Sequence, residues 1–164
     1  MIELNDAASC INSVRSVRAA SLRDEPFWGT VAMKLKICPC ESHGGEEIDT
    51  LATDGHHLFV NPDYFKSKLP DERKTAILHE VAHVALCHPL RRMGRDPELF
   101  NIACDLAVNI WLKDSGYAIP EEWYCEERYR GWSAERIYAD RLPKKQPKGK
   151  PPQGGRPGGK PSKD

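Results

Sequence analysis

Two histidines and a glutamate near the middle of the chain have the spacing of a metal site carried by one helix. His79 and His83 are four residues apart, so a helix through them presents both imidazoles on one face to one metal ion. Glu80 is offset around the helix and reaches a water activated by the metal rather than the metal itself. The ion lowers the pKa of this water and polarises a carbonyl group. The spacing therefore predicts one Zn²⁺, with Glu80 as the general base of a hydrolysis.

The residues around this motif favour a buried site. From Ala76 to Cys87 the chain reads AILHEVAHVALC, in which His79, Glu80 and His83 are the polar members. A helix that is apolar nearly all round is buried, and buried ionisable groups need partners or a metal. The alternative is two core histidines with satisfied hydrogen bonds beside a buried glutamate. Three such groups at ligand spacing are difficult to satisfy in that way.

A second apolar segment offers the third ligand. Residues 99–112 read LFNIACDLAVNIWL, and their polar members Asn101, Asp105 and Asn109 recur every four residues, forming one stripe on a helix. A catalytic zinc site uses three protein ligands and keeps one position open. We expect Asp105 to be the third ligand. Asn101 and Asn109 would then orient the ligands through hydrogen bonds. The alternative is a polar stripe that faces solvent.

Two further histidines are candidates for places behind the ligands or in the cleft. His88 is the rival third ligand, but five residues after His83 a continuous helix turns it away. Only a break near Pro89 would bring it back to the metal. His57 lies beside a predicted turn and is a candidate for the cleft.

Other residues that could do chemistry have simpler interpretations. Cys38, Cys40 and His43 could form half of a second metal site, but the sequence has no second cysteine pair at suitable spacing. Cys87 and Cys104 are expected as reduced thiols inside apolar helices. The conceivable oxyanion donors, for which packing is the default role, are Tyr64, Tyr117 and Tyr129.

Hydrophobic periodicity predicts the elements that carry these residues. We expect a helix over 4–22, a strand over 31–37, a polar loop over 38–49 and a hairpin over 50–60 with its turn at Asp54-Gly55. The metal-site helix should begin at Pro70 and stop near Pro89. The second site helix should run over 96–116 with Asp96 as its cap, and Ser133 should cap a last helix reaching about Leu142.

Charge and composition divide the chain into a body over residues 1–142 and a tail over 143–164. The tail carries seven Lys or Arg and one acidic residue, whereas the body carries 17 basic and 23 acidic residues. An acidic body argues against nucleic-acid binding by the folded part. The Pro/Gly/Lys-rich tail is expected to be disordered, with at most weak electrostatic contact to a nucleic acid or partner.

The location expected from the sequence is the cytoplasm. The N-terminus lacks the apolar region of a secretory signal, and no stretch approaches eighteen apolar residues, so we expect no membrane partner.

Several segments resemble one known family, the predicted metal-dependent peptidases whose N-terminal domain usually precedes a von Willebrand factor A-like domain. The matching segments are PFWG (26–29), LATDGHHLFVNPDYF (51–65), ILHEVAHVALCHPLRR (77–92), DPELFNIACDLAVN (96–109), GYAIPEEWY (116–124) and RGWSAERIY (130–138). The resemblance implies a zincin-like α+β fold, with a small mixed sheet packed on the active-site helix and further helices. It also implies His79, His83 and Asp105 as ligands and Glu80 as base. By analogy, the strand near 58–60 borders the substrate cleft.

The chain departs from the family where it ends in a low-complexity tail rather than an A-like domain. Family members also often neighbour AAA+ ATPases, which implies such a partner by analogy alone. The metzincin pattern fits poorly, because Leu86 and Pro89 stand where its glycine and third histidine would be.

Two functions follow from these patterns. The first is a zinc metallopeptidase acting on peptides or proteins. The alternative is a non-catalytic zinc-bound module for partner binding or assembly, working with an ATPase or a separate A-like domain. The presence of Glu80 favours the first, because a structural zinc site needs no base and is usually closed by a fourth ligand.

Overall fold

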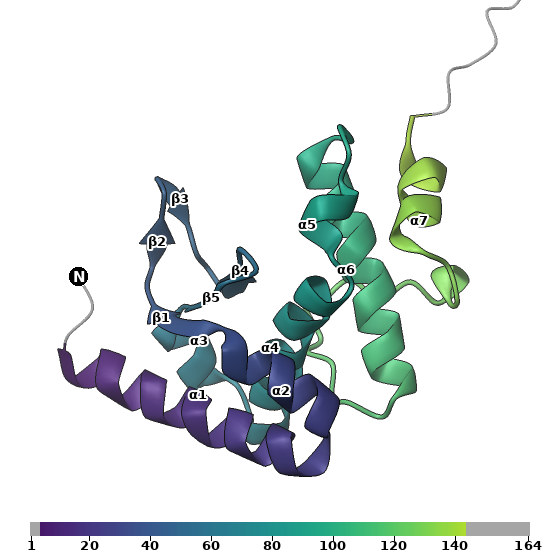
Figure 1. Cartoon of the computed structure of the whole chain (residues 1–164). Helices are drawn as coiled ribbons and strands as arrows, with labels where there is room; N and C mark the ends of the chain where they lie inside the picture. The colour runs from purple at the N-terminus through teal and green to yellow at the C-terminus, as the bar shows by residue number, and fades with distance from the viewer. Residues whose placement is uncertain (1–3, 144–164) are drawn as a thin grey trace, which may run out of the picture.

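A computed structural model describes residues 4–143, which form helices and a small mixed sheet that lies to one side of them (Figure 1). The α+β class predicted from the sequence is confirmed. The predicted tail lies outside the described residues, apart from Pro143. In this part of the chain the helices are α1 (Leu4–Asp24), α2 (Pro26–Lys34), α3 (Pro62–Ser67), α4 (Pro70–Ala85), α5 (His88–Arg91), α6 (Pro97–Asp114), the 3-10 turn η1 (Glu127–Tyr129) and α7 (Ala134–Arg141). The strands are β1 (Lys36–Pro39), β2 (Ser42–His43), β3 (Glu46–Glu47), β4 (Leu51–Thr53) and β5 (His57–Val60).

The main sheet has three strands in the order β1-β5-β4. β1 runs parallel to β5, and β4 runs antiparallel to it, as the predicted hairpin requires. At the hairpin turn Gly55 has a φ of 90°, and the Asp54 carboxylate accepts hydrogen bonds from the backbone N–H groups of His56 and His57. Since β5 lies between the other two strands, β4 is an edge strand of this sheet. The segment predicted as a polar loop also contains the small β2–β3 hairpin.

The predicted strand over 31–37 is wrong for its first half, because residues through Lys34 belong to α2 and β1 begins at Lys36. The alternation of apolar residues and lysines was misleading. Trp28, Val31, Ala32 and Leu35 recur at helical spacing and contribute to the main core cluster. Pro26 begins this helix. A Cβ at Gly29 would lie 2.2 Å from the Leu22 Cα, so only glycine lets α2 approach α1 this closely.

α4 is the central helix, because it packs against α2, β4 and α6 (Figure 1). Ile77 and Val81 join the main core, which also contains strand and α1 residues. Leu78 and Ala82 pack against Val108 of α6 in a second cluster. Its buried faces therefore hold α4 in place between the sheet and α6.

The α4 helix ends earlier than predicted, at Ala85 rather than near Pro89. Cys87 adopts a left-handed backbone conformation with a φ of 54°, and α5 begins immediately after it at His88. Cys87 is exposed, contrary to the buried position expected for it, whereas Cys104 is buried as expected. All six cysteines are free thiols. The break changes the direction of the chain directly after the two motif histidines.

The two helix caps predicted from the sequence are confirmed. Asp96 caps α6 by accepting a hydrogen bond from the Leu99 backbone N–H, and Ser133 caps α7 through the Arg136 N–H. Gly116, with a φ of 86°, follows the end of α6. Among the described residues, no helix combines the length and the apolar character needed to cross a membrane.

Candidate metal centre

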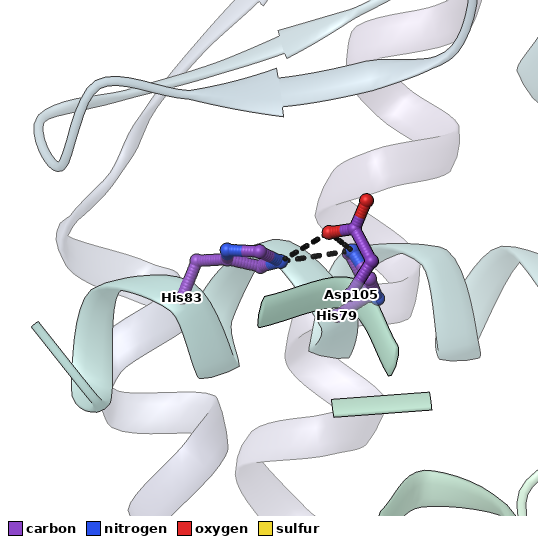
Figure 2. A group of neighbouring side chains, drawn as sticks. All are labelled: His79, His83 and Asp105. Atoms are coloured by element: carbon purple, nitrogen blue, oxygen red, sulfur yellow. Dashed lines mark hydrogen bonds and ion pairs between the residues drawn. The ribbon is translucent and has the colours of Figure 1, made fainter. Parts of the chain in front are cut away.

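Three side chains from two helices converge on one point (Figure 2). The Nε2 atoms of His79 and His83 lie 2.9 Å apart, and Oδ1 of Asp105 lies 3.4 Å and 3.2 Å from them. Donor atoms about 2.0–2.1 Å from a tetrahedral zinc are separated by roughly 3.3 Å, close to these distances. Two imidazoles and one carboxylate are also a donor set that zinc accepts. The group can therefore hold a metal ion with little movement.

His79 is oriented by Asn109, a buried residue of α6. The Nδ1 atom of His79 lies 2.8 Å from the Asn109 Oδ1, and the Asn109 Nδ2 donates to the Tyr124 carbonyl at 3.0 Å. Since the amide nitrogen is used by that carbonyl, the amide oxygen faces the histidine and accepts from its Nδ1–H. The lone pair of His79 is then on Nε2, facing the group.

His88 orients the ring of His83, as Asn109 orients that of His79. The break at Cys87 returns the buried His88 to α4, where its Nδ1 lies 3.3 Å from Nδ1 of His83. This contact is on the opposite side of the His83 ring from the Nε2 atom that faces the group. Burial lowers the pKa of His88 to about 4, so the ring is neutral and can accept the His83 Nδ1–H. His88 thus lies behind a ligand position and not in the group itself.

The Asp105 carboxylate faces both imidazoles. Burial raises its pKa, but the contacts with His79 and His83 outweigh that effect, so the pKa is below its usual range. Its second oxygen accepts a hydrogen bond from Nδ2 of Asn101 at 3.2 Å. The Asn101-Asp105-Asn109 stripe therefore faces the α4 histidines. The alternative of a stripe that faces only solvent is wrong.

Glu80 lines the same cleft, beside the three converging side chains. Burial raises the pKa of this carboxyl to about 7, with His83 opposing the rise and Asp105 adding to it. A carboxylate with a pKa near neutrality is a stronger base than an exposed one and can both accept and return a proton.

The cleft has a volume of about 550 Å³ and is bordered on one side by Thr50 and β4. The resemblance implied that residues 58–60 would border it. That expectation is wrong, because β5 is the central strand and the edge strand β4 lies nearer to α4. His57 does not line this cleft; its Nδ1 contacts the Asp54 carboxylate at 2.8 Å in the hairpin turn.

An aromatic pair that the sequence did not reveal forms another part of the wall. The Trp123 ring packs on His79 with ring centres 4.7 Å apart, and its Nε1 donates to the Tyr64 hydroxyl at 3.1 Å. Of the three tyrosines considered above, Tyr64 lines the cleft, while Tyr117 and Tyr129 do not. Trp123 comes from the irregular segment after α6, where nothing in the spacing marks a site residue.

No second metal group forms in the part of the chain that the structure describes. Cys38, Cys40 and His43 are not brought together as ligands, and the group on α4 and α6 is the one that meets the distance requirement there.

The geometry defines a class of protein: an α+β domain with a group of side chains that can hold a metal ion between its central helix and α6, open to a cleft beside a sheet edge. The chain belongs to the family described as "putative metallopeptidase domain", whose model matches residues 13–163. The match includes every residue of the candidate centre.

One curated relative is an uncharacterized protein of Thermotoga maritima, 21% identical over 141 residues, which covers 70% of this chain. The alignment covers 36% of that relative, so the chain spans about a third of its length. No solved structure matches the chain significantly.

Proposed function

We propose that this domain is a zinc-dependent peptidase in which Glu80 acts as the general base. The observation that carries the proposal is the convergence of His79, His83 and Asp105 in a cleft that Glu80 also lines. Membership of a family described as a metallopeptidase domain supports the same class of reaction.

The proposed ligand set uses three protein atoms and leaves a coordination position for the reaction. A zinc ion at this place would supply Lewis acidity toward a water and the scissile carbonyl. Asn109 and His88 fix the ring orientations of the two histidines, so both Nε2 lone pairs point to one place. The hydrogen bonds at the far sides of the rings thus keep the donor set assembled.

Glu80 would take the proton of the attacking water and pass it to the leaving amine. Its raised pKa suits both halves of that task. Tyr64 is the proposed donor to the developing oxyanion. Its hydroxyl already accepts from Trp123, which leaves the phenol proton available, and burial raises its pKa so that the group stays protonated.

The edge strand β4 would bind the substrate backbone. An extended peptide can pair with the free edge of a sheet, and Thr50 and β4 line the cleft beside the metal group. Such pairing places a peptide bond along the cleft without requiring a particular side chain. This mode of binding favours a polypeptide substrate over a small amide.

The test compares the protein with Glu80→Gln for zinc content and for cleavage of a diverse peptide library. We expect about one zinc per chain in both proteins and cleavage only by the unmodified one, with a loss of at least about 100-fold in the variant. Glu98→Gln, which changes an exposed carboxylate on the first turn of α6, is the matched control and should remain active. Zinc bound by all three proteins with cleavage by none would exclude the peptidase and leave a metal-binding module.

A further inference from the structure

The cleft contains one cationic side chain from the described residues, Arg92. The other charged groups that line it are Asp105, which belongs to the converging group, Glu80 beside that group, and Glu122. Glu122 is already paired with Lys68. Arg92 therefore supplies the only cation of the described cleft wall that is free to meet a ligand.

The neighbouring arginines use their charge inside the fold, whereas Arg92 does not. Arg91 makes a two-pronged contact with Glu135, with distances of 2.8 and 2.7 Å. Arg95 donates to two backbone carbonyls and lies over the Phe100 ring. The Arg92 guanidinium has no hydrogen-bond or ion-pair partner among the described residues. No structural role accounts for its charge.

The order of the elements places Arg92 at a defined end of the cleft. His79 is at the end that contains Trp123 and Tyr64. At the other end α4 breaks, and His88 packs on His83 just ahead of Arg92. At this end, α5 and the start of α6 contribute the apolar residues Pro89, Pro97 and Phe100 to the cleft wall. This end therefore combines an apolar wall with an unpaired guanidinium.

We infer that Arg92 binds a carboxylate of the substrate, so that the domain prefers peptides with an acidic group on the His83 side of the scissile bond. This inference rests on the proposed peptidase function. The Arg92 side chain is exposed and free to turn toward a ligand. A guanidinium offers two parallel N–H donors to a carboxylate and discriminates against a neutral amide. The carboxylate comes from an Asp or Glu side chain or from the C-terminus of the peptide.

The experiment uses short alanine-based peptides in which one Glu is moved along the sequence, each matched with the same peptide containing Gln. A second pair differs only in having a free or an amidated C-terminus. We expect kcat/KM to be at least about 10-fold higher for Glu than for Gln at one position. An advantage confined to the free C-terminus would identify the terminal carboxylate as the group bound.

Variants of Arg92 then test the residue itself. Arg92→Ala should remove the preference, and Arg92→Glu should reverse it toward Lys at the same position, with zinc content unchanged. Arg15→Glu makes the same charge change at an exposed arginine on α1 and should leave the preference intact. A preference that persists in Arg92→Ala, or equal cleavage within both kinds of peptide pair (Glu against Gln, and free against amidated C-terminus), would overturn the inference while leaving the peptidase standing.

Peptide-binding measurements test the role of Arg92 separately from the proposed peptidase activity. Dissociation constants of the same peptides for the Glu80→Gln protein, measured by calorimetry with zinc present, should show the same Glu-over-Gln preference and its loss in Glu80→Gln/Arg92→Ala. That binding pattern, together with no cleavage of any peptide by the unmodified protein, would support the role of Arg92 and reject the peptidase. Equal binding within both kinds of peptide pair, or binding of no peptide, would reject the role of Arg92.

Discussion

The Nδ1 atom of His79 lies 2.8 Å from the side-chain oxygen of Asn109, a residue 30 positions further along the chain. This bond joins α4 to α6 behind the candidate metal centre. Because Asn109 is buried and its amide nitrogen is held by the Tyr124 carbonyl, its orientation is fixed before any ion binds. The hydrogen bond thus determines which imidazole nitrogen is available to a metal.

Replacing this partner should weaken metal binding. We expect Asn109→Ala to lower zinc affinity by about 10–100-fold, because His79 loses the acceptor that fixes its ring. Competition with a chromogenic chelator would measure the change, and Asn12→Ala on exposed α1 would serve as the control. An unchanged zinc affinity in a folded Asn109→Ala protein would show that the contact has no role in positioning His79.

Metal removal should destabilise the unmodified protein but not a ligand variant. A ligand present at 100 times its dissociation constant stabilises the native state by about 2.7 kcal/mol. We expect EDTA to lower the Tm of the unmodified protein and to leave that of Asp105→Asn unaffected. Thermal unfolding with and without added zinc measures both effects. If Asp105→Asn responded to EDTA like the unmodified protein, Asp105 would not be a ligand.

The left-handed conformation at Cys87 should make glycine favourable there. A non-glycine residue with a φ of 54° carries a strain of about 1 kcal/mol, which glycine avoids. Since Cys87 is exposed, its replacement removes no core packing. We expect Cys87→Gly to raise the free energy of unfolding by about 0.5–1 kcal/mol, and Cys87→Val to lower it by a similar amount. Urea denaturation of the three proteins would compare them, and a Val variant as stable as the Gly variant would contradict the expectation.

Acid should weaken the contact between α5 and α7. Burial alone would raise the pKa of Glu135, but backbone and Arg91 hydrogen bonds and the Arg91 charge bring it below 4.5. The folded state therefore favours the ionised form, and this contribution is present above about pH 4.5 and lost as the pH falls further. Because the pair is partly exposed, Glu135→Gln should cost only about 0.5–1 kcal/mol at pH 7.

The difference between Glu135→Gln and the unmodified protein should shrink as the pH falls below 4.5. Denaturation at a series of pH values measures it, with Glu121→Gln as an exposed control on the segment after α6. A difference that stayed constant down to pH 3 would mean that the ion pair is not its source.

Removal of one hydroxyl tests the aromatic wall of the cleft. Under the proposed mechanism, Tyr64→Phe should lower kcat by about 10–1000-fold with little change in KM, because the lost donor acts on the transition state. Zinc content should be unchanged. Tyr117→Phe, at a tyrosine outside the cleft wall, should retain full activity. A Tyr64→Phe protein with normal kcat would remove Tyr64 from the mechanism.

Local patterns predicted the site better than the sheet. The four-residue spacings of α4 and α6 are geometric, so the faces of His79, His83 and Asp105 followed from the sequence, and their convergence agrees with that expectation. The prediction of a strand over 31–37 was wrong because VAMKLKI fits both an alternating and a helical pattern. The packing of Trp28 and Leu35 in the core favours the helix.

Other parts of the site depend on tertiary structure. The position of His88 follows from a backbone turn at Cys87, for which cysteine has no preference. Trp123 reaches His79 because the segment after α6 folds back over α4, and no periodicity describes such a segment. The choice of β4 rather than β5 as the cleft border depends on strand order, which a hairpin pattern does not specify.

The two helices that carry the metal group also belong to different parts of the core. α4 contributes to the cluster that includes α1, α2 and the sheet, whereas α6 contributes to the one with η1 and α7. Their shared cluster is small and built from Leu78, Ala82, Val108 and Leu112. An ion held by His79, His83 and Asp105 would act as a cross-link across this seam, closing a loop that the unfolded chain leaves open. Metal binding would then couple the unfolding of these two parts of the core more tightly.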